Sequence, residues 1–312
     1  MIQDTILFGD CRETLKEFDG KARMCVTSPP YYGLRDYGGE DSQIGQEQTP
    51  EEYIQQLVEV FRSVRDVLTD DGTLWVNIGD SYYNYRPGRG QGLVKQTVSN
   101  TKQDLPDVCP RRGNRLEGLK EKDLIGIPWM LAFALRADGW YLRQDIIWHK
   151  PNPMPESVRD RCTKSHEYIF LLSKNRKYFY DNEAIKEPVK KDWGTRDRTN
   201  GKYHNKGTGL QPHSGLTKSY TTKNKRSVWS VTNKSYKGAH FATYPPDLIE
   251  PCIKAGSEKG DTILDPFMGS GTTAVVAKTL GRNYIGCELH EEYGKLIKKR
   301  LSEQSFGKLD LI

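Results

Sequence analysis

The sequence lacks the patterns that mark disulfide scaffolds, zinc sites and membrane spans. Its six cysteines are scattered over 312 residues without a C-x-x-C pair, and its histidines do not cluster at metal-ligand spacing. No segment approaches 18 consecutive apolar residues, and the opening MIQDTILFGD has no basic segment followed by an apolar run. We therefore expect a cytoplasmic chain without a metal site, a secretion signal or a membrane span.

A strong excess of one charge is also lacking. Lys and Arg total 47 against 41 Asp and Glu, and the pI is about 8.8. This balance is a mild bias toward polyanions that many ordinary enzymes share. A chain of this length can bury a full core, so we expect one large α/β domain or one domain that carries a sizeable insertion.

What is present is an alternation of short apolar runs, typical of buried strands, with amphipathic segments, typical of helices. The expected strands are 5–9, 22–27, 73–79, 140–150, 166–174, 262–265 and 283–288. The expected helices are 10–18, 49–68, 123–139, 245–256 and 272–281, with a basic helix at the end. In the clearest helix, Thr49 can cap the N-terminus and Pro50 fits the first position, and DDG (70–72) predicts a turn after it. The alternation predicts a doubly wound, mostly parallel sheet that binds ligands beyond the carboxyl ends of its strands.

Two basic stretches interrupt this alternation. Residues 81–122 contain nine Lys and Arg against four acids, and residues 190–237 contain twelve against two, interleaved with Trp and Tyr. Loops of this length are unusual unless they are functional or disordered. Solvated surface loops are one interpretation. Contact with nucleic acid is the other, because cations among aromatic rings can hold phosphates and stack on exposed bases.

A glycine-rich turn follows the strand at 262–265, in the segment ILDPFMGSGTTAVVA, and GRNYIGCEL comes next. Gly269 and Gly271 allow a tight turn and the close approach of a ligand, and Glu288 ends the next strand, where its carboxylate can accept two ribose hydroxyls. A phosphate-binding P-loop would need Lys in place of Thr272. The unit predicts a site for a ligand that contains a ribose.

Two kinds of ligand compete for this site. A dinucleotide is one, since Gly269, Gly271 and Ala274 satisfy G-x-G-x-x-A. Asp265 favours S-adenosylmethionine, because a carboxylate at the strand tip would repel a pyrophosphate and suits an ammonium group. The alternative to ligand binding is a structural role, in which Asp265 only caps the following helix.

The segment TSPPYYG (27–33) ends the strand at 22–27 with two prolines. An exocyclic amino group of a base is a poor nucleophile, because its lone pair is delocalised into the ring. Acceptors on its two N–H bonds would make the nitrogen more tetrahedral. The Ser28 hydroxyl and the Pro29 carbonyl can be these acceptors, Pro30 stiffens the turn, and Tyr31 offers a ring for stacking. A base reached in this way must leave the duplex, so cationic contacts with the phosphates are expected.

On these segments the chain resembles the S-adenosylmethionine-dependent DNA amino-methyltransferases, which methylate N4 of cytosine or N6 of adenine. TSPPYYG resembles their catalytic motif IV, DPFMGSGTT their cofactor motif I and GCEL their motif II. WHKPNPMP and HEYIFLLSK resemble segments that follow the catalytic turn. The order, catalytic turn first and cofactor turn last, is that of the β group, whose Rossmann-like methyltransferase sheet is circularly permuted.

The resemblance implies which residues hold the cofactor. FGD resembles the strand end whose acid, here Asp10, contacts the cofactor adenine. FATYPPDLIEPCI resembles motif X, which implies that Thr243, Tyr244 and Pro245 lie beside the methionine end. The remaining cofactor residues that it implies are Asp265, Phe267, Gly269, Gly271, Thr272 and Glu288.

The resemblance also implies a layout and a substrate. Residues 1–185 would form the catalytic half with the basic loop 81–122, residues 186–240 the target-recognition insertion, and residues 241–312 the cofactor-binding half. In the family, Ser at the first position of motif IV leans toward cytosine N4, and Asp or Asn leans toward adenine N6, which is the alternative here. Cytosine C5 is disfavoured, because its methylation needs a thiolate and the turn has no Cys.

Partners and more distant functions follow from the same comparison. The implied partner is double-stranded DNA. Two further partners stay open: a separate restriction endonuclease that acts on the same site, and a second copy of the chain in a homodimer. Transfer to RNA or to a protein amide, and a nicotinamide-dependent dehydrogenase, are the alternatives from other classes.

Overall fold

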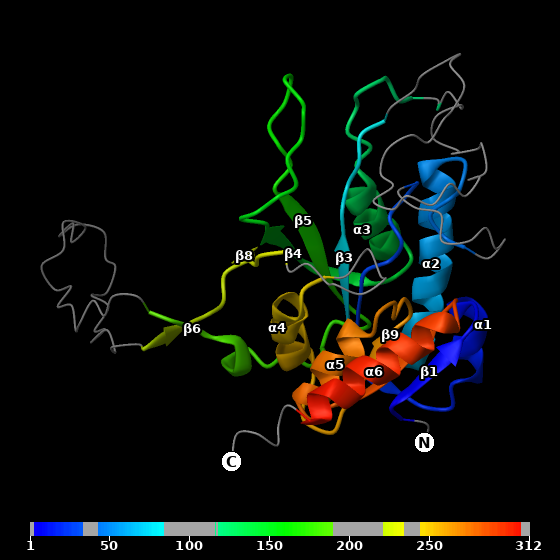
Figure 1. The fold of residues 1–312 in the computed structure, drawn as a ribbon, viewed down its shortest axis with the longest axis vertical. Coiled ribbons are helices and arrows are strands. Elements are labelled where there is room, and N and C mark those ends of the chain that lie inside the picture. The colour runs from blue at the N-terminus through cyan, green and yellow to red at the C-terminus, as the bar shows by residue number, and fades with distance from the viewer. Residues whose placement is uncertain are drawn as a thin grey trace, which may run out of the picture.

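The computed structural model describes residues 3–33, 43–83, 116, 118–189, 221–233 and 244–306. Within these ranges, eight strands form one sheet in the order β1-β10-β9-β2-β3-β5-β4-β8 (Figure 1). The strands are β1 (Thr5–Phe8), β2 (Ala22–Thr27), β3 (Leu68–Ile78), β4 (Tyr141–His149), β5 (His166–Ser173), β8 (Val228–Ser230), β9 (Thr262–Asp265) and β10 (Asn283–Glu288). Only β5 among them runs antiparallel to its neighbours. The expectation of a mostly parallel sheet is confirmed.

Strands β2 and β9 are neighbours in the middle of this sheet. They pair in parallel, with Cys25 opposite Leu264. The proline turn follows β2 and the glycine turn follows β9, so the two turns lie at the same edge of the sheet. They meet there although Thr27 and Asp265 are 238 residues apart in the sequence.

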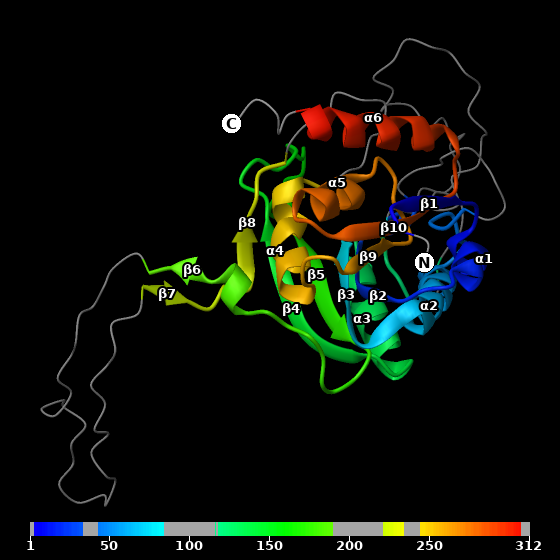
Figure 2. The same ribbon diagram turned by 90° about the horizontal axis from the view of Figure 1, so that it is seen from below.

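Helices cover both faces, as the alternation predicts. Helices α1 (Cys11–Thr14), α2 (Pro50–Val67) and α3 (Ile127–Ala137) pack on one face, and α4 (Pro246–Gly256) and α5 (Thr272–Thr279) pack on the other, with α6 (Glu292–Phe306) against α5 (Figure 2). Successive strand residues point to opposite faces. Cys25 accordingly belongs to the first core cluster, and Met24 and Val26 belong to the second.

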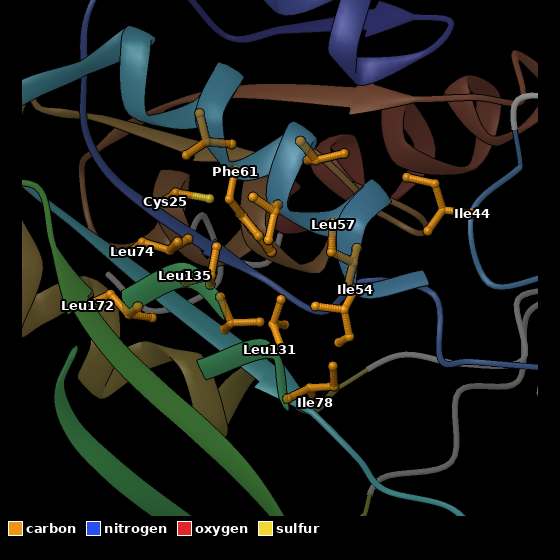
Figure 3. Packing of buried hydrophobic residues seen from close by; sticks show 14 of the residues in the cluster. Cys25, Ile44, Ile54, Leu57, Phe61, Leu74, Ile78, Leu131, Leu135 and Leu172 are labelled. Carbon is orange, nitrogen blue, oxygen red and sulfur yellow. The ribbon is translucent and has the colours of Figure 1, made fainter. Parts of the chain in front are cut away.

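Helix α2 forms where its capping signals predict. The Thr49 hydroxyl accepts from the Glu52 backbone N–H at 3.2 Å, and the Glu52 carboxylate accepts from the Thr49 N–H at 3.2 Å. Leu57 and Phe61 are fully buried and point toward α3 and the sheet (Figure 3). Burying a side chain of this size contributes roughly 1.5–3 kcal/mol, so this interface anchors α2 on the sheet.

Two expected element boundaries are wrong. The segment expected to turn at 70–72 lies inside β3, which begins at Leu68, and the pairing with β2 shifts its register there. A Cβ on Gly72 would come within 2.9 Å of the Thr69 carbonyl oxygen, so the bend is accommodated by a glycine within the strand. The expected helix 10–18 is divided into α1 and a 3₁₀ turn, Leu15–Glu17.

The described part of the predicted recognition insertion contains a small sheet of its own and one strand of the main sheet. Strands β6 (Glu187–Pro188) and β7 (Thr222–Lys223) pair at its base, and β8 extends the main sheet beside β4 (Figure 2). Residues 84–115, 117, 190–220 and 234–243, which include the rest of both basic stretches, lie outside the described residues. Among the helices that are described, none is both long and apolar enough to cross a membrane.

Candidate active site

A cavity of about 520 Å³ lies at the edge of the sheet where the loops after β1, β2, β9 and β10 meet. Both special turns contribute to its lining. The predicted catalytic residues that line it are Ser28, Pro30 and Tyr31, and the predicted cofactor residues that line it are Asp10, Tyr244, Phe267, Gly269, Thr272 and Glu288. The two turns therefore face one shared space, as a transfer between two bound molecules requires.

The proline turn is held from below by helix α2. The Tyr53 hydroxyl donates to the Pro30 carbonyl at 2.7 Å, and the Tyr53 side chain is fully buried. Pro29 is buried beneath the turn, whereas Ser28 is half-buried and lines the cavity. The rigid prolines and the Tyr53 hydrogen bond together limit the directions that the Ser28 hydroxyl can take.

Tyr31 is held through its hydroxyl and through one edge of its ring. Its hydroxyl donates to Glu167 Oε2 at 2.7 Å. A Cβ on Gly79 would come within 2.7 Å of its Cε2, so the ring packs directly on that glycine. Burial raises the pKa of Tyr31 well above its ordinary value, and the Glu167 carboxylate raises it further. The phenol is therefore neutral and its ring is a preformed wall of the cavity.

The glycine turn depends on backbone conformations that favour glycine. Gly269 has φ 53° and Gly271 has φ 80°, both left-handed. Gly271 also lies against α6, because a Cβ there would come within 2.9 Å of Ile297 Cγ2. It does not line the cavity, so its expected role in binding stays a prediction, and its role in packing is clear.

Glu288 closes the glycine turn from the next strand. Its Oε2 accepts from the Gly269 backbone N–H at 2.8 Å, and its Oε1 accepts from the His290 N–H at 3.1 Å. A carboxylate has about four acceptor positions. Glu288 therefore keeps capacity for further donors, as two ribose hydroxyls would need. Burial raises its pKa above the ordinary glutamate value, and the two backbone hydrogen bonds partly offset this.

Asp265 has a different set of contacts from the one that the sequence suggests. Its carboxylate is 1% exposed and accepts from the Thr27 hydroxyl at 2.6 Å, the Thr273 hydroxyl at 2.5 Å, the Tyr244 hydroxyl at 3.1 Å and the Phe267 N–H at 3.0 Å. Four donors fill a carboxylate's ordinary acceptor capacity. Asp265 thus ties β2, the glycine turn, α5 and the segment before α4 together. A direct contact with an ammonium group stays a prediction without support from these contacts.

Asp10 lines the cavity at the end of β1 and caps α1. Its Oδ1 accepts from the Arg12 backbone N–H at 2.8 Å, and its Oδ2 is 2.5 Å from Arg12 Nη2. Burial alone would raise the pKa of Asp10, but the hydrogen bonds and charge of Arg12 lower it overall. The contact with a cofactor adenine stays a prediction for this ionised, partly buried group.

The comparison with known protein families decides the class of the chain. The model of a DNA methylase family matches residues 22–299. The chain belongs to this DNA methylase family. The methylase is also 48% identical over 297 residues to the type II methyltransferase M.SmaI of Serratia marcescens, with 95% of this chain and 90% of the relative covered. The type II methyltransferase M.Cfr9I of Citrobacter freundii is 47% identical over 298 residues, with 95% and 87% covered.

Solved structures support the fold of the methylase. The cytosine-N4-specific PvuII DNA methyltransferase has a TM-score of 0.62 at 18% identity, with 96% of this chain and 86% of that chain covered. TTHA0409, a DNA modification methylase described as putative, from Thermus thermophilus, complexed with S-adenosyl-L-methionine, has a TM-score of 0.57 at 22% identity, with 96% and 93% covered. At these identities the likeness concerns the Rossmann-like fold.

Motif X of the methylase lies only partly within the described residues. Thr243 lies outside them. Tyr244 lines the cavity. Its hydroxyl lies 2.5 Å from the Thr273 hydroxyl and donates a hydrogen bond to Asp265. Pro245 is the N-cap residue of α4, whose first helical position is Pro246, and it does not line the cavity.

The sequence analysis missed a group of residues that line the cavity of the methylase beside the proline turn. They come from β3, β4, β5 and the loop after β4, and they are Asn77, Trp148, Lys150, Met154 and Glu167. A signal existed, since Lys150 and Met154 lie in WHKPNPMP and Glu167 lies in HEYIFLLSK. These segments resemble family segments, but nothing in their local pattern places them next to residues 28–31.

Proposed function

We propose that this DNA methylase transfers a methyl group from S-adenosylmethionine to the N4 amino group of a cytosine that has left the DNA duplex. The observation that carries the proposal is the single cavity lined by Ser28 of the proline turn and by Gly269 and Glu288 of the glycine turn. Support for cytosine comes from Ser28 at the first position of the S-P-P-Y turn and from the fold likeness to a cytosine-N4-specific enzyme.

The lining of the cavity fits S-adenosylmethionine. The described residues of the lining include three carboxylates, those of Asp10, Glu167 and Glu288. Lys150, which lies near the proline turn, is the only Lys or Arg among these described residues. At the glycine turn Arg300 hydrogen-bonds to Ser270 and Thr272 but does not line the cavity, so the described lining there is acidic. Such a lining suits a ligand that has a sulfonium and an ammonium group and no phosphate. Glu288 would hold the ribose, and Asp10, Phe267 and Tyr244 would border the rest. When bound there, the cofactor supplies an electrophilic methyl group.

The residues of the proline turn would prepare the amino group. The Ser28 hydroxyl, which lines the cavity, would accept one of its two N–H bonds, and the Pro29 carbonyl, whose residue is buried and does not line the cavity, stays the predicted second acceptor. Together they would direct the nitrogen lone pair out of the ring plane and across the cavity. Tyr31 stacks on the base and keeps it in that orientation. The proton that the amino nitrogen loses after the transfer passes to water or to a weak acceptor. No group of high pKa is needed, because the developing positive charge acidifies the N–H.

DNA recognition is assigned to the basic stretches. We propose residues 186–240 as the target-recognition insertion, with residues 81–122 as a second source of phosphate contacts, because flipping a base costs a few kcal/mol that cationic contacts must offset. Their charge supports this, with twelve Lys and Arg against two acids in residues 190–237.

The deciding experiment is incubation with unmethylated DNA of mixed sequence and labelled S-adenosylmethionine, followed by mass spectrometry of the nucleosides. We expect N4-methyldeoxycytidine. N6-methyldeoxyadenosine would refute the choice of base and leave the turn chemistry intact. A label that reaches neither base, in a protein whose melting temperature rises with S-adenosylhomocysteine, would refute the activity.

A further inference from the structure

Lys150 is a half-buried cation that lines the cavity, and the transfer chemistry described above does not use it. It directly follows β4, and its side chain is 17% exposed. Its ammonium contacts Glu167 Oε1 and lies 4.3 Å from the centroid of the Trp148 ring. Held between a carboxylate and an aromatic face, the ammonium has a defined position, which a solvated lysine does not have.

The same carboxylate links Lys150 to the proline turn. Glu167 Oε2 accepts from the Tyr31 hydroxyl at 2.7 Å and from the Asn77 side-chain amide at 3.2 Å, while Glu167 Oε1 contacts Lys150. Glu167 therefore places the Tyr31 ring and the Lys150 ammonium on either side of one small group. A base that stacks on the Tyr31 ring would therefore present its edge to the Lys150 ammonium, because Glu167 fixes the distance between that ammonium and the ring.

The edge of cytosine has the acceptors that such a donor needs. Beside the N4 amino group, cytosine carries N3 and then O2, both acceptors, whereas adenine carries N1 and then a C2–H beside its N6 amino group. The contact with Glu167 uses one of the three N–H bonds of an ammonium. A second N–H directed into the cavity would find O2 in cytosine and a C–H in adenine.

We propose that Lys150 recognises the O2 carbonyl of the flipped cytosine, and that Glu167 is the positioning residue that aims it. This inference rests on the proposed transfer to cytosine N4 and adds the group that selects the base. An ammonium that meets a C–H in place of a carbonyl loses a charge-assisted hydrogen bond in a partly desolvated site. The discrimination expected is about 10- to 100-fold.

A purely structural role is the competing explanation. Lys150 and Glu167 bridge β4 and β5, and removing one of them would leave the other charge partly buried without its partner. Loss of activity in a Lys150 variant would therefore not separate the two explanations. A comparison of two substrates within each variant does separate them, because a structural defect affects both substrates alike.

The test uses two DNA duplexes that contain the target site found by sequencing methylated DNA. One carries cytosine at the target position. The other carries a 2-aminopyridine C-nucleoside, which keeps the amino group and the neighbouring ring nitrogen and has a C–H in place of the O2 carbonyl. Single-turnover rates and duplex affinities in the presence of S-adenosylhomocysteine are measured for the wild type, Lys150→Met and Lys174→Met. Lys174 is a matched control, since it is 19% exposed and ion-paired near the opposite edge of the sheet.

The wild type and Lys174→Met should prefer cytosine over the analogue by about 10- to 100-fold, and Lys150→Met should lose that preference. A preference that is unchanged in Lys150→Met would overturn the inference, as would a wild type without any preference. Affinities give the same comparison if Lys150→Met turns over neither substrate. The melting-temperature rise with S-adenosylhomocysteine should be unchanged in all three proteins, which confirms an intact cofactor side.

The failure of this inference differs from the failure of the proposed function. If the wild type forms N4-methyldeoxycytidine and Lys150→Met keeps the preference, the function stands and the role of Lys150 falls. If the wild type forms N6-methyldeoxyadenosine, the choice of cytosine and the recognition of O2 fall together, and the nucleoside analysis alone shows it.

Discussion

Replacing Asp265 tests whether this carboxylate organises the site or binds the cofactor. In Asp265→Ala, four donors lose their acceptor. The Tyr244 and Thr273 hydroxyls are 2.5 Å apart, so one can donate to the other, but the hydroxyl that accepts keeps an O–H without an acceptor. The Thr27 hydroxyl and the Phe267 N–H also lose their acceptor. Each buried orphan costs about 1–3 kcal/mol.

The cost of the carboxylate's own burial reduces this loss. Burial raises the pKa of Asp265, so its ionised form is held at some expense, which the hydrogen bonds from Thr27 and Thr273 offset only in part. We therefore expect Asp265→Ala to lower the free energy of unfolding by about 2–4 kcal/mol. In a chain of this length one kcal/mol corresponds to about 1.5 °C, so the melting temperature should fall by about 3–6 °C.

Asp265→Asn separates the two roles. The amide oxygen can still accept from Thr27 and Phe267, and the amide nitrogen can donate to the hydroxyls of Tyr244 and Thr273. An organising role predicts a melting temperature within about 2 °C of the wild type. It also predicts an affinity for S-adenosylhomocysteine within about threefold of the wild type, measured by calorimetry.

A direct contact with the ammonium group predicts another result. Loss of the Asp265 charge would then lower the affinity for S-adenosylhomocysteine by more than about tenfold, because hydrogen bonds to charged groups contribute about 1.5–3 kcal/mol. A stable Asp265→Asn protein with that loss of affinity would refute the organising role. Ser28→Ala is the control that should leave the affinity unchanged.

Four further predictions concern the two turns and the core. Ser28→Ala should lower the single-turnover rate by about 10²-fold, because it removes one acceptor of the amino group; a rate within threefold would contradict the role given to that hydroxyl. Gly79→Ala should push the Tyr31 ring away, since the new Cβ would lie 2.7 Å from Cε2. Its rate should fall at least about tenfold with the cofactor affinity intact, and an unchanged rate would argue against stacking on Tyr31. The affinity for S-adenosylhomocysteine should fall as the pH drops through the raised pKa of Glu288, because the protonated acid is a weaker acceptor. The raised pKa of Glu288 also adds to the free energy of unfolding of the free protein at low pH, and this contribution is lost as the pH rises through that pKa. Affinity and stability should therefore change in opposite directions with pH. Glu288→Gln should abolish the pH dependence of the affinity. Phe61→Ala, at a fully buried position of α2, should lower the free energy of unfolding by about 3–5 kcal/mol, measured by chemical denaturation. A loss below about 1 kcal/mol would contradict the packing in Figure 3.

The two turns could be predicted from the sequence because their signals are local. The proline pair ends a strand whatever surrounds it, and Gly269 and Gly271 mark left-handed backbone that other residues rarely adopt. The capping box of α2 is likewise contained in four consecutive residues, from Thr49 to Glu52. The boundary error at 70–72 arose where pairing of β3 with β2, and not local preference, sets the backbone. In 10–18 the α-helix passes into a tighter 3₁₀ turn, as is frequent at helix ends.

The role of Asp265 could not be predicted for the opposite reason. Its position before a glycine turn is compatible with cofactor binding and with capping. Which of these applies depends on donors that arrive from elsewhere, such as Thr27, 238 residues away. The Lys150–Glu167–Tyr31 chain is similar, because three segments must meet before their charges and hydroxyls can interact.

The sequence by itself determined that this chain is an α/β protein with a rigid proline turn and a left-handed glycine turn, because those features follow from the stereochemistry of a few adjacent residues. Only the tertiary structure decided that β2 and β9 are neighbours, that both turns line one cavity, and which side chains occupy the space between them. Hydrogen bonds and burial depend on distances in space, and distances between residues far apart in a chain are set only when the sheet assembles.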